Sequence, residues 1–246
     1  MLSKTNVKYI QSLRHKKLRE EEQSFIAEGP KVVGELLSSG IFECKMICAP
    51  EGWFTTNGLL VANIPRENIF VVDETGLEKI SLLKTPHQVL GVFRNKPVRE
   101  TRWNNKLTLV LDDIHDPGNM GTIIRIADWF AVENIVCSYE CVECYNPKVV
   151  QASMGSLARV NIIYAELEKF ITDHEEIKLY AATLSGQPVS SFQKIKEGMI
   201  IIGNESKGVR QELLDLADEK ITIPKFGKAD SLNAGVAAGI ILSHIM

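Results

Sequence analysis

The sequence predicts an α/β protein in two parts, the second of which carries a largely parallel sheet. Short apolar segments recur along the chain, and most of those in the second half are separated by segments with the helical spacing of apolar residues. Such alternation is typical of a parallel sheet covered on both faces. A polar stretch near residue 100 interrupts the pattern. We therefore predict a first domain over residues 1–95, a linker over 96–106 and a second domain over 107–246.

The composition describes an ordinary globular chain, because 45% of its 246 residues are hydrophobic and 24% are charged. These values exclude an intrinsically disordered tail and a disulfide-stapled miniprotein. No apolar run reaches the roughly 18 residues of a membrane span, and the amino terminus lacks the apolar stretch of a signal peptide. We therefore expect a cytoplasmic protein without a membrane partner.

The five cysteines are an odd number in a chain without an export signal, so we expect free thiols. Cys137, Cys141 and Cys144 lie close together in the sequence. Three thiols without a fourth ligand nearby are a weak pattern for zinc. We interpret them as packing residues and expect no metal site.

The first part of the chain combines strand and helix patterns. Residues 24–28 are predicted to be extended, and a helix follows over 31–40, with Pro30 in its first turn and Gly40 at its carboxyl-terminal cap. Residues 73–83 also have helical spacing. Further strands are predicted at 45–49, 68–72 and 88–93. These elements predict a small α/β unit.

The second part begins with the best-defined helix of the chain. Asp116 is the expected N-cap, and Pro117 suits the first turn. The apolar stripe of this helix consists of Met120, Ile123, Ile124, Ala127 and Phe130. Arg125 falls away from that stripe, and residues 146–147 repeat the start signal before a second helix over 148–160. The strands are predicted at 107–111, 134–137, 161–164, 178–183, 199–203 and 220–224.

The carboxyl-terminal segment 231–242 is unusual, because it is apolar around its whole circumference and built mainly from small residues. Such a helix is expected to be buried. Small residues let two backbones approach closely, so the segment suits a crowded core or a subunit interface.

The basic residues are concentrated at the amino terminus, although the formal net charge is −3. Between residues 4 and 19 no acidic residue occurs. A cationic stretch of this length can neutralise several phosphates, but it also fits a solvated helix face, and the sequence alone leaves both open. The candidate RNA-binding residues in this stretch are Lys4, Arg14, Lys16, Lys17 and Arg19.

Common nucleotide and hydrolase motifs are missing from the sequence. It contains no G-x-G-x-x-G after a strand, no phosphate loop, no H-E-x-x-H and no G-x-S-x-G, which argues against NAD, ATP and zinc chemistry. Three polar stretches with glycines remain, at 113–125, 203–209 and 223–233, each attached to an apolar strand or helix. Glycine permits close approach of a ligand, although any one of the three, taken alone, is better explained as a plain turn.

Taken together and in this order, the three stretches resemble the motifs of the SpoU family of RNA ribose 2′-O-methyltransferases, within the SPOUT class. The first motif is carried by Asp116, Pro117, Gly118, Asn119, Met120, Gly121, Arg125 and Ala127. The second is carried by Gly203, Asn204, Glu205 and Gly208. The third is carried by Ile223, Pro224, Asp230, Ser231, Leu232 and Asn233. The chain departs from the family pattern at Ala131, Gln151 and Ser206.

The amino-terminal part resembles the ribosomal-protein-like substrate-binding domain of the same family. The residues that carry this likeness are Glu28, Gly29, Thr85, His87 and Gln88. The resemblance as a whole implies a trefoil-knotted carboxyl-terminal domain that binds S-adenosylmethionine and forms a homodimer. It also implies these cofactor-binding residues: Thr183, Leu184, Gly203, Asn204, Gly208, Ile223, Pro224 and Leu232.

The resemblance implies catalytic roles for Asn119, Arg125, Glu205, Ser231 and Asn233. A guanidinium is effectively always protonated, so we interpret Arg125 as a phosphate anchor and a stabiliser of the developing alkoxide rather than a base. We favour this role of Arg125 over the second hypothesis, in which Glu205 accepts the proton of the ribose hydroxyl. The structural alternatives are a helix-start residue for Glu205 and a helix cap for Ser231.

The function that the resemblance implies is S-adenosylmethionine-dependent 2′-O-methylation of structured RNA. Ribosomal RNA is favoured because of the extra amino-terminal domain. Two alternatives stay open: a transfer RNA 2′-O-methyltransferase, and a non-catalytic RNA-binding factor for ribosome assembly.

Overall fold

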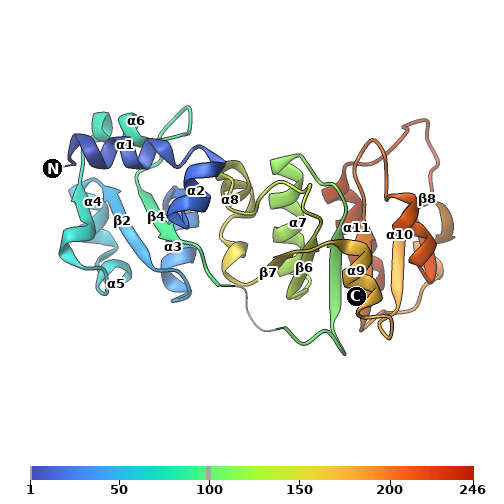
Figure 1. Ribbon diagram of the computed structural model, residues 1–246. Helices are drawn as coiled ribbons and strands as arrows, with labels where there is room; N and C mark the ends of the chain where they lie inside the picture. The colour runs from blue at the N-terminus through green and yellow to red at the C-terminus, as the bar shows by residue number, and fades with distance from the viewer. Residues whose placement is uncertain (1, 98–100) are drawn as a thin grey trace. The chain divides into compact units, whose positions relative to one another are not determined.

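The computed structural model describes residues 2–97 and 101–246, which form two compact units. Unit 1 comprises Met1–Pro97 and Glu143–Ala158, and unit 2 comprises Val98–Val142 and Arg159–Met246. The predicted linker 96–106 includes residues 98–100, which lie outside the described part of the chain. Figure 1 shows the order of the elements along the chain.

Unit 1 contains a four-stranded sheet in the order β1-β4-β2-β3. Its strands are β1 (Ser24–Glu28), β2 (Cys44–Ala49), β3 (Ile69–Val71) and β4 (Leu90–Arg94). Strand β4 is antiparallel to β1 and β2, and β3 is parallel to β2. Its helices are α1 (Lys4–Ser12), α2 (Lys16–Glu22), α3 (Pro30–Ser38), α4 (Glu51–Thr56), α5 (Gly58–Val61), α6 (Glu74–Ile80) and α8 (Pro147–Ser153). The sequence patterns did not predict α4 and α5.

The segment 143–158 belongs to unit 1, although the sequence division assigned it to the second domain. Tyr145 stacks on Phe25 of β1 with ring centroids 4.6 Å apart. Gly155 has φ +91°, and a Cβ there would lie only 2.4 Å from the Cβ of Glu35 in α3. The predicted helix over 148–160 is therefore shorter, since α8 ends at Ser153 where the chain turns to meet α3.

Unit 2 contains a six-stranded sheet in the order β10-β8-β9-β5-β6-β7, and every strand pair in it is parallel. Its strands are β5 (Leu107–Leu111), β6 (Asn134–Cys137), β7 (Asn161–Tyr164), β8 (Leu179–Pro188), β9 (Gly198–Ile202) and β10 (Glu219–Thr222). Its helices are α7 (Pro117–Trp129), α9 (Leu167–Thr172), α10 (Gln211–Leu216) and α11 (Ala234–Ile245). The prediction of a parallel sheet is confirmed.

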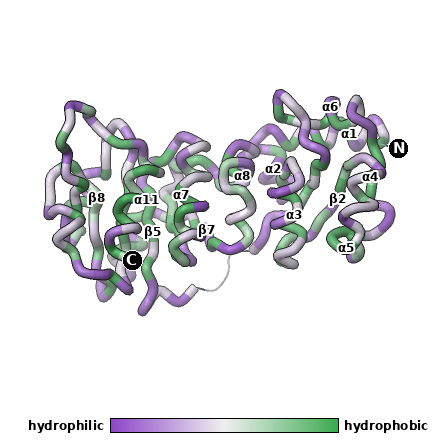
Figure 2. The backbone as a smooth tube through the Cα atoms, turned by 180° about the vertical axis from the view of Figure 1, so that it is seen from behind, coloured by the Kyte–Doolittle hydropathy of each residue, from purple (hydrophilic) through white to green (hydrophobic). Residues whose placement is uncertain are grey.

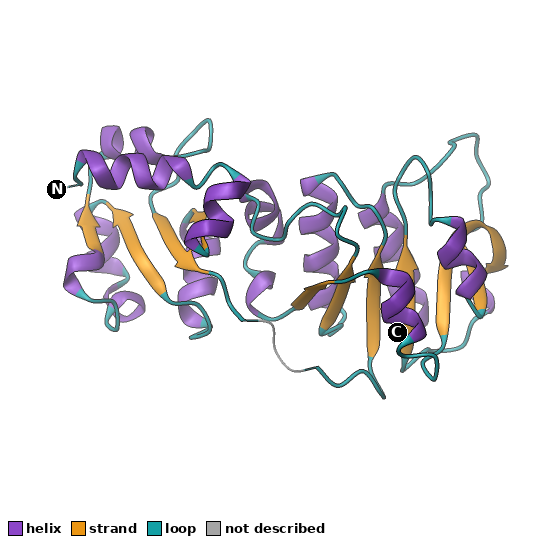
Figure 3. Ribbon diagram, viewed as in Figure 1, coloured by secondary structure: helices purple, strands orange, loops and turns teal. Residues whose placement is uncertain are grey.

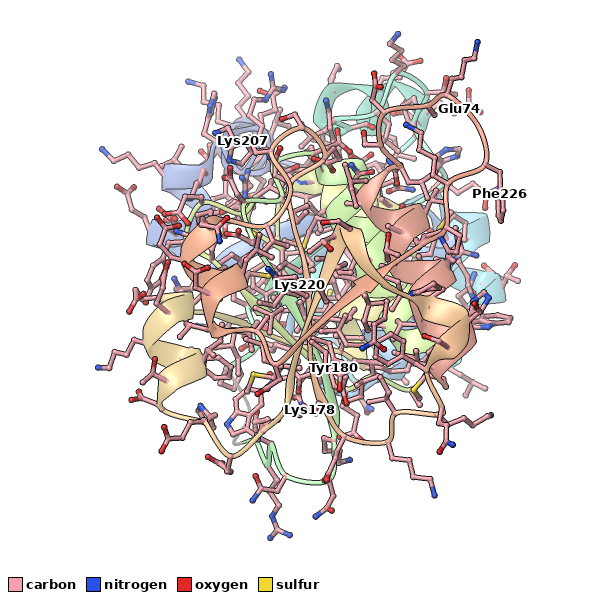
Figure 4. The ribbon with its side chains drawn as sticks, turned by 90° about the vertical axis from the view of Figure 1, so that its right-hand side faces the viewer. Glu74, Lys178, Tyr180, Lys207, Lys220 and Phe226 are labelled. Carbon is pink, nitrogen blue, oxygen red and sulfur yellow. The ribbon has the colours of Figure 1, made fainter. Side chains whose placement is uncertain are left out.

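Helices cover both faces of this sheet, as the edge-on view of Figure 4 shows. On one face, Leu167 and Ile171 of α9 and Leu213 of α10 pack against Val110 and Ile201. Because side chains alternate along a strand, neighbouring strand residues face the opposite layer, where α7 and α11 contact each other. Figure 2 shows α11 as largely hydrophobic. No helix of the described chain is long and apolar enough to cross a membrane.

Helix α11 begins three residues later than the sequence pattern predicts. Asn233 is its N-cap, and the Asn233 Oδ1 accepts a hydrogen bond from the backbone N–H of Val236 at 3.2 Å. Residues 223–233 before it form a loop (Figure 3). One side of α11 is not covered within the single chain, because Val236 is 49% exposed, so a crowded core does not account for the whole helix.

Candidate active site

The loops that follow β5, β9 and β10 meet at the carboxyl edge of the unit 2 sheet. The Asn119 Nδ2 donates a hydrogen bond to Glu205 Oε1, and the Asn233 Nδ2 donates one to Asn119 Oδ1 at 2.5 Å. Strands β5 and β9 are neighbours at the point where the strand order reverses direction. Ligands of open α/β sheets bind outside the carboxyl ends of strands at such a point. The three side chains therefore lie where a substrate is expected.

Helix α7 presents Asn119 because its start is fixed locally. The Asp116 carboxylate accepts a hydrogen bond from the backbone N–H of Asn119 at 2.8 Å and caps the helix, as predicted. Asn119 is only 8% exposed, so its side-chain amide has little access to water. A Cβ on Gly235 would lie 2.9 Å from Thr122, so a small residue here lets α11 approach α7 closely. This approach brings Asn233, the cap of α11, within reach of Asn119.

A tight turn after β9 holds Glu205. Asn204 and Gly208 exchange two backbone hydrogen bonds, of 3.1 and 2.8 Å. A Cβ on Gly203 would lie 2.3 Å from the backbone of both Gly208 and Val209, so only glycine fits there. The alternative that Glu205 starts a helix is wrong, because it lies in this turn and α10 begins at Gln211.

Sequence reasoning missed an ion pair beneath the site, between a buried carboxylate and a partly exposed arginine. Asp112 is fully buried after β5, and it accepts hydrogen bonds of 2.8 Å from both the backbone N and the Nε of Arg210. Burial raises the pKa of the Asp112 carboxyl, whereas the contacts with Arg210 act in the opposite direction. The available signal was a carboxylate directly after an apolar strand. The pair ties the loop after β5 to the segment that follows the Glu205 turn.

The loop after β5 is also supported by the loop after β6. The backbone N–H of Asp113 donates to Ser138 Oγ at 3.2 Å, and that of Ile114 donates to Cys141 Sγ at 3.3 Å. A hydrogen bond with Cys137 lowers the pKa of Cys141. The Asp113 carbonyl accepts from Asn204 Nδ2 at 2.8 Å, although Asp113 has φ +59°. The two cysteines therefore help to shape the loop that carries the site.

Two of the predicted catalytic residues do not join this network. Arg125 lies on α7, roughly 9 Å along the axis from Asn119, and is exposed. Within the described residues it makes no hydrogen bond or ion pair. Ser231 is exposed in the loop before α11, and it is not the cap, which is Asn233. Both side chains are available to a substrate from outside.

Of the predicted cofactor residues, Thr183 and Leu184 lie in the second half of β8, and the others lie in the turn after β9 and the loop after β10. Leu184 is 80% exposed and Leu232 is 44% exposed, so apolar surface faces solvent there. Thr183 donates its hydroxyl to the carbonyl of Ser185 at 2.5 Å. Ile223 and Pro224 directly follow β10. Apolar side chains beside backbone amides and carbonyls fit the adenosyl and methionyl groups of S-adenosylmethionine.

The amino-terminal basic residues are placed unequally. Lys4 and Arg14 are exposed, and Lys16 and Lys17 are exposed with Glu20 and Glu21 at 3.7 and 3.8 Å. Arg19 is only 3% exposed, forms an ion pair with Glu143 and donates to the carbonyl of Leu13 at 2.7 Å. The prediction that Arg19 contacts RNA is therefore corrected, since its guanidinium is enclosed in the core of unit 1.

Glu28, Gly29 and His87, three of the unit 1 residues that carried the family resemblance, lie close to one another. The buried Glu28 carboxylate accepts hydrogen bonds from Ser81 Oγ at 2.5 Å and the Leu82 N–H at 2.8 Å. Burial raises the pKa of Glu28. A Cβ on Gly29 would lie 3.5 Å from the Cβ of His87. None of the five cysteines forms a disulfide, and the described residues contain no cluster of three or more His, Cys, Asp or Glu side chains arranged for a metal ion.

Comparisons with known proteins identify the family of the chain. Residues 106–243 match the SpoU rRNA Methylase family, and residues 4–91 match the MRM3-like substrate binding domain. The chain is 28% identical to the 23S rRNA (guanosine(2553)-2′-O)-methyltransferase RlmP of Bacillus subtilis, over 97% of this chain and 95% of that enzyme. It is 24% identical to the mitochondrial rRNA methyltransferase 3 of Mus musculus, over 94% of this chain and 69% of that protein.

Solved structures support the same family. The AdoMet-bound rRNA methyltransferase of Sinorhizobium meliloti superposes with a TM-score of 0.87 at 32% identity, covering 100% of this chain and 96% of that one. The family match includes Asn119, Glu205 and Asn233, the three side chains joined at the carboxyl edge of the sheet. The chain belongs to the SpoU rRNA methylase family.

Proposed function

We propose that this protein transfers a methyl group from S-adenosylmethionine to the 2′-hydroxyl of a ribose in ribosomal RNA. The observation that carries the proposal is the hydrogen-bonded chain from Asn233 through Asn119 to Glu205 at the switch point of a SpoU-family sheet. Relatives matched over nearly the whole chain are named as ribosomal RNA methyltransferases. The MRM3-like domain at the amino terminus supports a structured RNA as the substrate.

The roles of the residues follow from their contacts. S-adenosylmethionine, when bound, supplies a methyl group on a sulfonium that a ribose oxygen can attack. Because the Asn119 amide donates a hydrogen bond to Glu205 Oε1, Glu205 Oε2 is the oxygen that accepts the proton of the ribose 2′-hydroxyl. Asn233 fixes the orientation of the Asn119 amide. Arg125, exposed and without a partner in the described chain, anchors a phosphate and stabilises charge on the attacking oxygen.

Methyl transfer to unmethylated ribosomal RNA tests the function. Purified protein is incubated with labelled S-adenosylmethionine and ribosomal RNA transcribed in vitro, and the RNA is digested to nucleosides. We expect label in a 2′-O-methyl nucleoside, unchanged by a metal chelator. Label in transfer RNA alone would reassign the RNA class, and RNA binding without transfer would indicate an assembly factor. Mapping 2′-O-methyl positions in cells with and without the protein identifies the nucleotide.

We also propose that the exposed cations of α1 and α2 contact RNA phosphates. Replacing Lys16 and Lys17 with Gln should weaken RNA binding, and each lost contact should reduce the magnitude of the negative slope of log affinity against log salt by about 0.7 to 0.9. The affinity for S-adenosylmethionine should not change, because its predicted residues lie beyond Thr183 in unit 2. Titrations of RNA at several salt concentrations measure the slope. An unchanged slope would mean a solvated helix face.

We propose in addition that unit 2 is trefoil-knotted and forms a homodimer through α7 and α11. The support for the dimer is exposed apolar surface: Trp129 of α7 is 84% exposed and Val236 of α11 is 49% exposed. Tryptophan is enriched in the cores of interfaces, where it buries a large apolar area. The two helices contact each other, so one surface can include both residues.

A charge on this surface should separate the subunits. We expect Trp129→Glu and Val236→Glu to sediment as folded monomers at concentrations where the wild type is a dimer, because each buries an unpaired carboxylate in an apolar interface. Leu59→Glu is the matched control, since Leu59 is 95% exposed on α5 of unit 1. A dimer that tolerates both changes would place the interface elsewhere.

A further inference from the structure

The loop from β10 to α11 carries an aromatic residue between two lysines. Residues 225–228 read Lys-Phe-Gly-Lys, and all four are exposed. The Phe226 side chain is 97% exposed, the highest value among the exposed large hydrophobic residues of the described chain. The same loop continues through Ser231 to Asn233, which is bonded to Asn119. The ring of Phe226 is thus exposed to solvent seven residues before Asn233 of the candidate site.

The charge around Phe226 is mainly positive. Lys225 and Lys228 form no ion pair with any described residue, and Asp230 is the acidic residue of the loop. Lys207, in the Glu205 turn, is 79% exposed and lies 3.9 Å from its nearest carboxylate, Asp113. Figure 4 shows Lys207 and Phe226 toward one end of the unit 2 sheet, on opposite sides of it, and Lys178 and Tyr180 toward the other end. The carboxyl edge therefore combines cations with an exposed ring.

A single exposed apolar side chain is ordinary on a protein surface. An aromatic ring between cations is more specific, because unpaired bases stack on aromatic faces while lysines neutralise the adjoining phosphates. A protein partner explains the loop less well, since lysine is depleted in interface cores. The positively charged sulfonium of S-adenosylmethionine is also a poor neighbour for two free lysines. A single-stranded segment of RNA fits the loop best.

We propose that Phe226 is a stacking platform for an unpaired base beside the methylated nucleotide, with Lys225 and Lys228 contacting the phosphates around it. This inference rests on the proposed methylation of RNA and adds a residue that selects the substrate. The platform holds the RNA and takes no part in methyl transfer itself. Substrates with an unpaired base next to the target ribose are favoured over fully paired ones.

Two substitutions of Phe226, one without an aromatic ring and one with it, test the stacking role. Phe226→Leu keeps an apolar side chain and removes the aromatic face, whereas Phe226→Tyr keeps the face. With unmethylated ribosomal RNA transcribed in vitro, we expect Phe226→Leu to raise KM and the dissociation constant of RNA by roughly tenfold, as loss of one stacked base does. Phe226→Tyr should stay within about twofold of the wild type, because it retains the stacking face. The kcat and the affinity for S-adenosylmethionine should change little in both variants.

The lysines are tested through the salt dependence of RNA binding. Lys225→Gln and Lys228→Gln should each reduce the magnitude of the negative slope of log affinity against log salt by about 0.7 to 0.9. Lys178→Gln is the control, since Lys178 lies at the opposite end of the sheet and pairs with Glu219. Its slope should equal that of the wild type.

Several outcomes would overturn the platform. These are wild-type RNA affinity in Phe226→Leu, failure of Phe226→Tyr to restore binding, and a fall in S-adenosylmethionine affinity without a fall in RNA affinity. Direct RNA binding separates this inference from the proposed function. If the wild type binds RNA but transfers no methyl group, methylation is wrong and the binding ratios still decide the role of Phe226. If the wild type binds no ribosomal RNA, both are wrong.

Discussion

Arg125→Ala should lose at least about 100-fold in kcat while the protein stays folded and binds S-adenosylmethionine normally. Removing one group that stabilises a developing oxyanion typically costs 10²- to 10³-fold. The Arg125 side chain is exposed and makes no hydrogen bond or ion pair in the described chain that the substitution would remove, so the free energy of unfolding should change by less than about 0.5 kcal/mol. Single-turnover methyl transfer, a cofactor titration and a melting curve measure the three quantities.

The matched variant for this experiment is Arg125→Lys. It keeps the positive charge but loses the planar fork that binds a phosphate through two hydrogen bonds. We expect it to retain part of the activity, between the wild type and Arg125→Ala. Parallel losses of melting temperature and activity in Arg125→Ala would instead assign a structural role to this residue.

Gly203→Ala should destabilise unit 2 and abolish binding of S-adenosylmethionine. A Cβ at this position would lie 2.3 Å from the backbone of Gly208 and Val209, and backbone atoms cannot rotate away as a side chain does. Overpacking against such a rigid neighbour costs about 3 kcal/mol, which lowers the melting temperature by roughly 10 °C. The displaced turn also carries Asn204 and Glu205. Calorimetry of unfolding and of cofactor binding measures both effects.

A second glycine provides a control of opposite sign. Gly52 lies in α4, and a Cβ there would meet no heavy atom within 4 Å. Gly52→Ala should therefore stabilise the protein slightly, by about 0.5 kcal/mol, because alanine loses less conformational entropy in a helix. Equal melting temperatures for Gly203→Ala and Gly52→Ala would contradict the steric explanation.

The elements whose boundaries depend on neighbouring residues could be predicted from the sequence. Helix α7 begins as expected because its signal is local: the Asp116 carboxylate caps the N–H of Asn119 only three residues away. The start of α11 was misplaced, because Ser231 and Asn233 are both good caps and only the second is bonded to the helix.

Contacts between distant residues could not be predicted from sequence patterns. Arg19 looks like a phosphate contact in the sequence, but its partner Glu143 is 124 residues away. The hydrogen bond between Asn119 and Glu205 joins residues 86 positions apart, and only the family resemblance indicated that they share a site. Periodicity reports which face of an element is apolar, but it does not report which element will cover that face.

Because residues 143–158 belong to unit 1, the substrate-binding module is not one continuous segment of the chain. A substrate-binding module excised at residue 97 would lack α8, the stacking partner of Phe25 and the anion that neutralises Arg19. Exchange of this module between enzymes by recombination at the linker would therefore leave an uncompensated guanidinium in a broken core. Successful transplantation requires the graft to carry both stretches of chain, or the recipient to supply a matching Tyr145 and Glu143.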